Sequence, residues 1–294
     1  MPPAVSTDLR RCYREDGAIH LSQALDQATL AEVERMFQWS LDNPTPSGCT
    51  FYDNESGTFY QDLCNPRAAL AYRTLLTDSC IADRVADLWG DEEVWFLYEQ
   101  VFYKHGGDTR RTPWHQDAPY LAVDGEHIAV VWINLESVQQ QHALEFVRGS
   151  HRGVLYDGSA FDDDDDTKPI YGSGLPRLPN IEADRSQWDI VSWAIEPGDI
   201  VVFHPRTLHG GGPTTQGMRR RTLSLRFFGA DAAYVERPTD APAPLVAGLH
   251  DSLRAGQPFR HPAFPQLRPV ARGFEQVPVI DGHVQSVRAK LQGG

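Results

Sequence analysis

The sequence predicts a mainly β protein with flanking helices, whose strands form a two-sheet antiparallel sandwich or barrel. Between about residues 94 and 230, short apolar runs with period-two alternation are separated by glycine, proline and aspartate turn signals. Helical periodicity is confined to about residues 8–90, so helices precede the strands and do not alternate with them. An alternating order would favour a parallel α/β sheet, and this order favours the antiparallel arrangement instead.

Composition limits the class of protein. The chain has 294 residues, enough for one large domain, and no internal boundary is evident, so we expect a single domain over 1–294. A net charge of −13 argues against a nucleic-acid partner. No apolar run could cross a membrane, and the N-terminus lacks the features of a secretory signal. Four cysteines without C-x-x-C spacing indicate free thiols. We therefore expect a cytoplasmic protein without a membrane partner.

The first ninety residues carry the helical pattern. Residues 8–16 predict a short helix, followed by an extended segment over 17–21. Ser22 is the expected cap of a helix over about 23–41, in which apolar residues recur at helical spacing. Residues 47–65 show no clear period and are expected to form a loop. A second amphipathic helix is expected over 78–89, with Gly90 as its C-terminal stop.

Six strands are expected in the second part of the chain. In the second of these, Ala129, Val131 and Ile133 share an apolar side, and the other side includes Trp132 and Asn134. The expected strands cover residues 94–104, 127–135, 144–147, 189–195, 200–203 and 220–228.

Residues 152–188 contain glycines, prolines and an acidic run, Asp162 to Asp166, with no period. An unstructured stretch of this length inside a compact domain is usually functional, so we expect a lid that is mobile without ligand. The acidic run is interpreted as a solvated loop, because it lacks the glycine and spaced oxygens of a calcium loop. The proline-rich extension over about 238–294 either wraps the body or frays.

One stretch suggests a metal site. In the segment 112–117, His115 and Asp117 would project from the same face of an extended chain and offer two of three ligands of an iron facial triad. A surface hydrogen-bonded pair would give the same short pattern. The third ligand is expected at His209, which three glycines and a proline follow. His204 is the rival, and its alternative interpretation is a hydrogen-bonded histidine of the core or rim.

A run of three arginines follows His209. Strand parity puts Arg220 on one face together with Thr222, Ser224 and Arg226, and puts Arg219 and Arg221 on the other. Polar side chains on an inward face of a β-sandwich need polar partners. A guanidinium can bind a carboxylate through two parallel hydrogen bonds. Arg219 and Arg221 fit a solvent-facing basic strip.

Taken together, four motifs resemble the phytanoyl-CoA dioxygenase family of iron(II)- and 2-oxoglutarate-dependent oxygenases. They are P-W-H-Q-D at 113–117, G-S-H at 149–151, P-G-D-I-V-V-F-H at 197–204 and H-G-G-G-P-T-T-Q-G-M-R-R at 209–220. The resemblance extends from Glu15 to about residue 230. It implies a double-stranded β-helix core, a jelly-roll variant related to cupins, over about 94–230.

The resemblance also implies roles for individual residues. The family arginine that binds 2-oxoglutarate usually comes eleven residues after the distal histidine, and 220 − 209 = 11 here. Gly211 stands where relatives often have serine. The implied cofactors are Fe(II), 2-oxoglutarate and dioxygen, and the implied reaction is hydroxylation with release of succinate and carbon dioxide. The implied iron ligands are His115, Asp117 and His209, and the implied 2-oxoglutarate contacts are Arg220, Gln100, Trp132 and Thr222.

Two other functions remain open at this point. A related halogenase would lack the carboxylate ligand, and the presence of Asp117 argues against it. A zinc-loaded or non-catalytic jelly-roll binding protein would keep the histidines without needing Arg220 at this distance. The partner is expected to be a small organic substrate, because so acidic a chain shows no basic docking surface for coenzyme A. Substrate identity and oligomeric state do not follow from the sequence.

Overall fold

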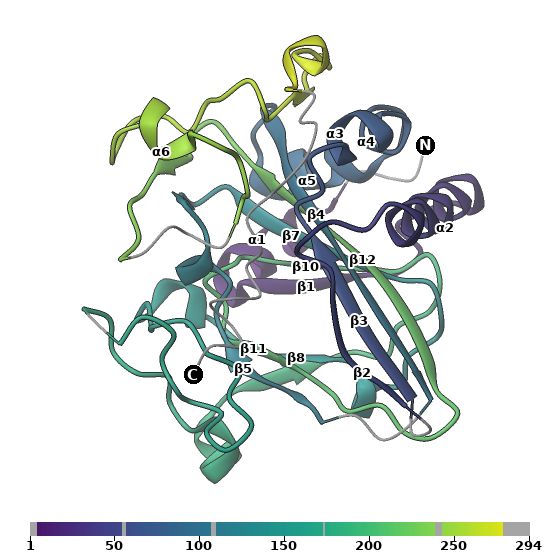
Figure 1. Cartoon of the computed structure of the whole chain (residues 1–294), viewed down its shortest axis with the longest axis vertical. Coiled ribbons are helices and arrows are strands. Elements are labelled where there is room, and N and C mark those ends of the chain that lie inside the picture. Colours follow the sequence, from purple (N-terminus) through teal and green to yellow (C-terminus); the bar gives the residue numbers. More distant parts are fainter. Residues whose placement is uncertain (1–4, 55–56, 107–109, 173, 239–242, 279–294) are drawn as a thin grey trace.

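In the computed structural model, two antiparallel sheets face each other and form a double-stranded β-helix (Figure 1). The structure describes residues 5–54, 57–106, 110–172, 174–238 and 243–278. The larger sheet has the order β1-β10-β7-β12-β4-β3-β2, and β14 also pairs with β4. Its strands are β1 (Ala18–Leu21), β2 (Cys49–Asn54), β3 (Gly57–Leu63), β4 (Val94–Gly106), β7 (Ile128–Asn134), β10 (Ile200–Phe203), β12 (Arg219–Phe228) and β14 (Gln266–Arg268).

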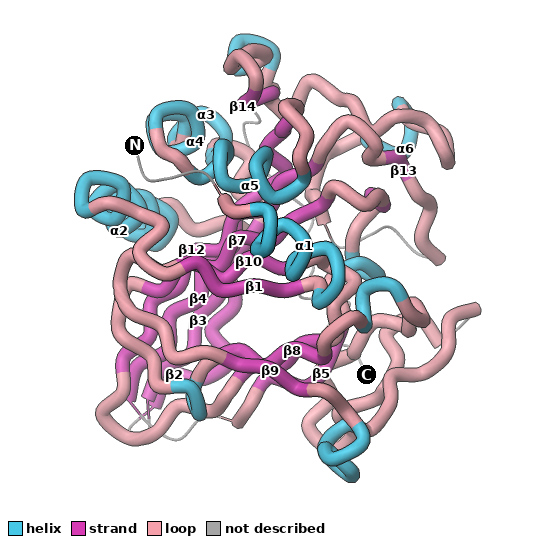
Figure 2. The backbone as a smooth tube through the Cα atoms, turned by 180° about the vertical axis from the view of Figure 1, so that it is seen from behind, coloured by secondary structure: helices cyan, strands magenta, loops and turns pink. Residues whose placement is uncertain are grey.

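The smaller sheet has the order β5-β11-β8-β9 and lies across from the larger one (Figure 2). Its strands are β5 (Thr112–His115), β8 (Leu144–Val147), β9 (Ile190–Ser192) and β11 (His209–Gly211). A further pair joins β6 (Val123–Asp124) to β13 (Ala233–Tyr234). The predicted mainly β fold with a jelly-roll core is therefore confirmed.

Helices cover one face of the larger sheet, called here the outer face (Figure 1). Alternation along β7 shows how the two faces are divided. Ala129, Val131 and Ile133 are fully buried against the helices, while Val130 belongs to the cluster between the two sheets. The face that carries Val130 and Trp132 is the inner face. The helices are α1 (Thr7–Asp16), α2 (Gln27–Asp42), α3 (Ala68–Ala71), α4 (Arg73–Asp78) and α5 (Ile81–Trp89).

The start of α2 differs from the prediction. Asp26, not Ser22, is the N-cap, and its side chain accepts a 2.8 Å hydrogen bond from the Thr29 N–H. The preceding residues are held in a turn, because Asp199 accepts a 2.7 Å bond from the Gln23 N–H and Gln23 has a φ of 47°. A long-range contact therefore delays the helix. The caps at the ends of α1 and α5 are as expected for glycine, since Gly17 and Gly90 are both left-handed.

The prediction of a loop over 47–65 is wrong, because these residues form the hairpin β2–β3 at the edge of the larger sheet. Most described side chains of β3 are only half-buried, so neither face presents a continuous apolar row. Period-two alternation of apolar and polar residues appears when one face of a strand is buried and the other is exposed to solvent. Because both faces of this edge hairpin are half-buried, the alternation is weak.

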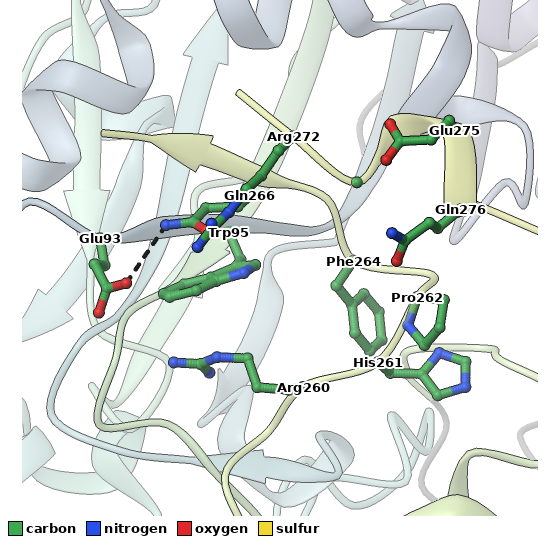
Figure 3. A pocket seen from close by; sticks show the side chains of 11 residues that line it. Glu93, Trp95, Arg260, His261, Pro262, Phe264, Gln266, Arg272, Glu275 and Gln276 are labelled. Carbon is green, nitrogen blue, oxygen red and sulfur yellow. Dashed lines mark hydrogen bonds between the residues drawn. The ribbon is translucent and has the colours of Figure 1, made fainter. Parts of the chain in front are cut away.

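The C-terminal extension wraps the body as far as it is described. Strand β14 pairs with the start of β4, and the short helix α6 (Leu249–Ser252) precedes it. Residues 239–242 and 279–294 of the predicted extension lie outside the described residues. A cavity of about 650 Å³ lies between this segment and β4, where Arg260 stacks on Trp95 (Figure 3). None of the predicted site residues lines it.

Two further expectations can be compared with the described part of the chain. The four cysteines are free thiols, as predicted. Within the described ranges, no helix is both long enough and apolar enough to cross a bilayer.

Candidate metal and co-substrate site

Three predicted ligands come together between the sheets. One ligand atom from each of His115, Asp117 and His209 lies within 4.8 Å of the others. Strand pairing brings the two histidines together, because His115 ends β5 and lies opposite His209 at the start of β11. Their ring centroids are 4.2 Å apart. Residues separated by more than ninety positions therefore meet through the register of the smaller sheet.

Asp117 reaches this cluster in a different way from the one predicted. Strand β5 ends at His115, and Asp117 has helical backbone angles (φ −75°, ψ −30°) at the start of a 3-10 helix, Ala118–Tyr120. Period-two alternation does not place it. The chain turns after the histidine, and this turn brings the carboxylate back toward the imidazoles.

Backbone carbonyls fix the tautomer of both imidazoles. His115 Nδ1 donates to the Pro113 carbonyl at 2.8 Å, and His209 Nδ1 donates to the Thr207 carbonyl at 2.9 Å. A ring whose Nδ1 carries the proton presents Nε2 as a lone-pair donor. These Nε2 atoms lie 3.5 Å and 3.8 Å from Asp117 Oδ1. Burial, together with the His115 charge, lowers the pKa of His209 to about 3, so its ring is neutral at pH 7.

A buried arginine holds the second oxygen of the carboxylate. Arg226 Nη2 donates to Asp117 Oδ2 at 3.0 Å and to Gln100 Oε1 at 2.8 Å. Its guanidinium also lies over the Tyr98 ring. Burial alone would raise the pKa of Asp117, but Arg226 and the two imidazoles outweigh it and hold this pKa well below its usual range. Asp117 is therefore ionised, with Oδ1 directed at the imidazoles and Oδ2 held by Arg226.

His204 does not join the cluster. Its Nδ1 accepts from the Arg206 N–H at 3.1 Å, so its Nε2 carries the proton that it donates to the Gly125 carbonyl at 3.0 Å. Both ring nitrogens are occupied, and the group that could hold a metal does not include this residue. The structure therefore favours the interpretation of His204 as a hydrogen-bonded histidine.

The predicted co-substrate residues lie on the inner face. Arg220, Thr222, Ser224 and Arg226 are all buried, as strand parity predicted. Arg219 and Arg221 lie on the outer face, where both form ion pairs with Glu136. The remaining contacts are Arg220 Nη1 to the His142 carbonyl at 2.5 Å, Thr222 Oγ1 to Asn134 Oδ1 at 2.7 Å, and a Trp132–Phe102 ring contact at 4.9 Å.

The glycines after His209 allow close packing of backbones. A Cβ on Gly212 would lie 2.6 Å from the His142 carbonyl carbon, and one on Gly210 would lie 2.9 Å from the Thr112 carbonyl oxygen. Side chains at these positions would push β11 away from its neighbours. At Gly211, a Cβ would lie 3.1 Å from Thr112 Oγ1, which leaves little room for the serine of relatives.

Sequence reasoning assigned no role to two charged residues of this site. Parity had placed Arg226 on the inner face, but nothing in the sequence showed that it reaches Asp117. Lys104 is also buried on the inner face, directly opposite Arg220 in the register of β4 and β12. Lys104 has the same parity as Gln100 along β4, and this could have placed it on the inner face.

The start of the predicted lid, residues 152–188, is hydrogen-bonded to the predicted metal-binding motif. Gln116, between the two predicted ligands, donates to the Val154 carbonyl at 3.1 Å and accepts from the Tyr156 N–H at 2.9 Å. Further along, the Phe161 ring contacts the His115 ring edge-on at a centroid distance of 5.1 Å. The segment therefore covers one side of the triad.

Exposed ion pairs hold the acidic run in place. Arg110 binds Asp163 and Asp166, Lys168 binds Asp162, and Arg177 binds Asp165. Exposed pairs of this kind contribute roughly 0–1 kcal/mol each. The acidic run is thus held by weak polar contacts. Other parts of the segment are anchored in the core, since Leu178 and Ile181 are buried in an apolar cluster with Trp114.

We expect the segment 152–188 to exchange its amide hydrogens faster in the free protein than with metal, 2-oxoglutarate and substrate bound. The acidic run within it is attached by exposed polar contacts, and bound ligands would add contacts beneath Phe161. Hydrogen-exchange mass spectrometry measures this, with peptides from β7 as an internal control that should not change. Equal protection of 152–188 with and without ligands would count against a lid.

The Arg226–Asp117 pair should be strongly coupled. Replacing Arg226 with methionine leaves a buried carboxylate without its cation, which should lower the free energy of unfolding by roughly 3–5 kcal/mol. In a double-mutant cycle with Asp117→Asn on the metal-free protein, the double variant should lose less than the sum of the single losses. Urea unfolding measures the free energy of unfolding of the parent, the two single variants and the double variant. The exposed pair Arg148–Asp16, at 3.2 Å, is the control and should change stability by less than about 1 kcal/mol. Additive losses at Arg226 and Asp117 would refute the coupling.

Comparison with known proteins identifies a family that this chain matches. Residues 13–221 match the sequence profile of the family described as phytanoyl-CoA dioxygenase (PhyH). The human peroxisomal phytanoyl-CoA dioxygenase is 29% identical over 138 residues, which is 45% of this chain and 37% of the human protein. A probable phytanoyl-CoA dioxygenase of Caenorhabditis elegans is 25% identical over 249 residues, covering 77% of this chain and 76% of that protein.

A solved structure shares the fold at lower identity. The epimerase SnoN, in a complex with Fe3+, alpha ketoglutarate and nogalamycin RO, superposes with a TM-score of 0.67 at 23% identity. The match covers 89% of this chain and 98% of the SnoN chain. At this identity the likeness establishes the double-stranded β-helix.

Proposed function

The chain belongs to the phytanoyl-CoA dioxygenase family, and from this premise we propose that it hydroxylates a C–H bond of a small organic substrate. The reaction would consume 2-oxoglutarate and dioxygen and release succinate and carbon dioxide. The observation that carries the proposal is the convergence of His115, Asp117 and His209 on one point between the sheets.

The residues present fit an iron(II) ion. Two imidazoles can offer Nε2 lone pairs, because each Nδ1 carries the proton donated to a carbonyl, and one ionised carboxylate offers Oδ1, which is the donor set of a facial triad. Carbonyl partners on both Nδ1 atoms orient the rings, as is usual for metal-binding histidines. When bound, iron(II) supplies the redox chemistry through which 2-oxoglutarate and dioxygen oxidise the substrate.

The protein's own residues supply orientation and charge. Arg226 holds Asp117 Oδ2, so that one oxygen of this carboxylate is available to a metal. Arg220 presents a guanidinium on the inner face of β12, suited to bind the distal carboxylate of 2-oxoglutarate. We propose that Gln100, Trp132 and Thr222 border the same co-substrate.

Aromatic side chains border the metal side of the site. The Tyr120 ring is 6.4 Å from the His115 ring and stacks with Phe161 at 6.1 Å. These rings would keep water from the reacting centre when the segment 152–188 is in place. We infer that they also form part of the substrate pocket.

The presence of Asp117 favours hydroxylation over halogenation. A halogenase of this type needs the carboxylate position for a halide. Here the carboxylate is buried, ionised and directed at both imidazoles, so that position is taken.

We propose that the substrate is a small or secondary metabolite and not an acyl-coenzyme A. A net charge of −13 disfavours binding of a polyphosphate adenosine moiety. The similar proteins differ in the molecules with which they are associated, phytanoyl-CoA for the human dioxygenase and nogalamycin RO for SnoN. We infer that the loops around the site, and not the shared fold, determine which substrate binds.

A product screen tests the proposal. The iron-loaded protein would be incubated in air with 2-oxoglutarate and a library of small metabolites, and products would be analysed by mass spectrometry. We expect at least one compound to gain one oxygen atom with matching formation of succinate. The Asp117→Ala variant is the control and should give no such product. Conversion of an acyl-coenzyme A alone would refute the substrate class, and a chlorinated product in the presence of chloride would refute hydroxylation.

A further inference from the structure

A buried lysine lies on the inner face beside Arg220. Lys104 is 3% exposed and lies on β4, directly opposite Arg220 on β12. In antiparallel strands the β-carbons of directly opposed residues lie about 4.5–5.5 Å apart on the same face. Gln100 lies four residues from Lys104 along β4, and its contact with Arg226 shows that both project from the inner face. Lys104 and Arg220 thus project from adjacent strands on the inner face of the larger sheet.

The surroundings of Lys104 do not neutralise its charge. Its ammonium lies 4.2 Å from the centroid of the Phe59 ring, which β3 presents on its other side. Arg220 is the charged group that acts on it among the residues the structure describes, and its effect is repulsive. No carboxylate of those residues offsets this repulsion. Burial and Arg220 together lower the pKa of Lys104 to about 7.

A buried ammonium that is repelled by a neighbouring cation is unfavourable unless an anion also binds it. A buried charge is costly without a partner, and a cation–π contact offsets only part of that cost. An anion between the two groups would remove the repulsion and restore the charge of Lys104. Its carboxylate could accept a forked pair of bonds from Arg220 and a single bond from the ammonium.

We propose that Lys104 is a second binding residue for the distal carboxylate of 2-oxoglutarate and acts together with Arg220. This inference rests on the proposed function, since it assumes that 2-oxoglutarate binds between the sheets. The co-substrate carries two carboxylates, one in the keto acid that a metal would bind and one at the far end. In this proposal Lys104 binds the distal carboxylate and does not contact the keto acid.

Binding of two probes to the manganese-loaded protein without oxygen tests the inference. One probe is 2-oxoglutarate, and the other is 2-oxopentanoate, which keeps the keto acid but has a methyl group in place of the distal carboxylate. Lys104→Met should weaken 2-oxoglutarate binding at least tenfold and change 2-oxopentanoate binding by less than twofold, as measured by titration calorimetry. Lys104→Arg should restore most of the discrimination.

Arg219→Met is the matched control, because it removes a positive charge beside Arg220 from the exposed outer face. It should change both affinities by less than twofold. An equal loss for both probes in Lys104→Met would assign the lysine a merely structural role and overturn the inference, as would no loss for either. If the parent protein bound neither probe, the proposed function itself would fail, and this outcome differs from the other two.

Proton uptake gives an independent readout. A lysine with a pKa of about 7 is mostly neutral at pH 8 and mostly charged at pH 6. Because an anion raises this pKa, 2-oxoglutarate should bind with uptake of a proton at pH 8 and with much less uptake at pH 6. Calorimetry in two buffers of different ionisation enthalpy measures the uptake. It should disappear in Lys104→Met, and unchanged uptake in that variant would contradict the assignment.

Discussion

Replacing His209 with alanine is expected to empty the metal site, and His115→Ala should do the same. In the proposed site each ring would supply one of three donors, and a backbone carbonyl on Nδ1 leaves Nε2 of each ring available to a metal. Loss of a hydrogen-bond partner of a ligand costs about 10–100-fold in metal affinity, and loss of the ligand itself should cost more. Iron content after anaerobic loading, together with Co(II) titration followed by absorbance, measures the effect.

His204→Ala is the matched control, because this histidine is equally buried but binds the Gly125 carbonyl and the Arg206 N–H. Its removal should leave metal binding and most activity in place. If His204→Ala emptied the site while His209→Ala did not, the ligand assignment would be wrong.

Arg220→Ala is expected to raise the 2-oxoglutarate requirement by well over tenfold, with little change in iron affinity. A guanidinium paired with a carboxylate in a partly dry pocket is worth roughly 2–5 kcal/mol when removed, because the carboxylate is left unpaired. The variant also loses a bond to the His142 carbonyl, so its thermal stability must be measured beside its affinity. Steady-state kinetics with 2-oxoglutarate as the varied substrate give the requirement.

The two neighbouring arginines are internal controls for the Arg220 variant. Arg219 and Arg221 lie on the outer face and form partly exposed ion pairs. Replacing either one should therefore change the free energy of 2-oxoglutarate binding by less than about 1 kcal/mol. A large effect at Arg221 with a small one at Arg220 would contradict the assignment of the inner face to the co-substrate.

Strong period-two segments and long-range motifs were predictable from the sequence. Strands β8 and β10 have the predicted bounds, and β7 differs from its prediction by one residue at each end. Strands β7 and β10 are buried on both faces almost throughout, so their continuous apolar pattern agrees with their tertiary environment. The partition of the three arginines between two faces followed from strand parity alone.

Features that depend on contacts between distant residues were not predictable. The start of α2 depends on Asp199, which is far away in the chain. Asp117 reaches the predicted cluster through a turn that ends the strand, so the local geometry differs from the extended one that was predicted. The ion pair between Arg226 and Asp117 joins residues 109 positions apart, and no local signal announces it.

Succinate formation from 2-oxoglutarate is the most direct test of the central claim that the triad supports oxygenase chemistry. The parent protein, loaded with Fe(II) and supplied with oxygen and a substrate from the screen, should form one succinate for each 2-oxoglutarate consumed. Omission of iron or oxygen, or the Asp117→Ala substitution, should abolish this. Iron-loaded protein that forms no succinate with any compound, or an Asp117→Ala variant as active as the parent, would contradict the account.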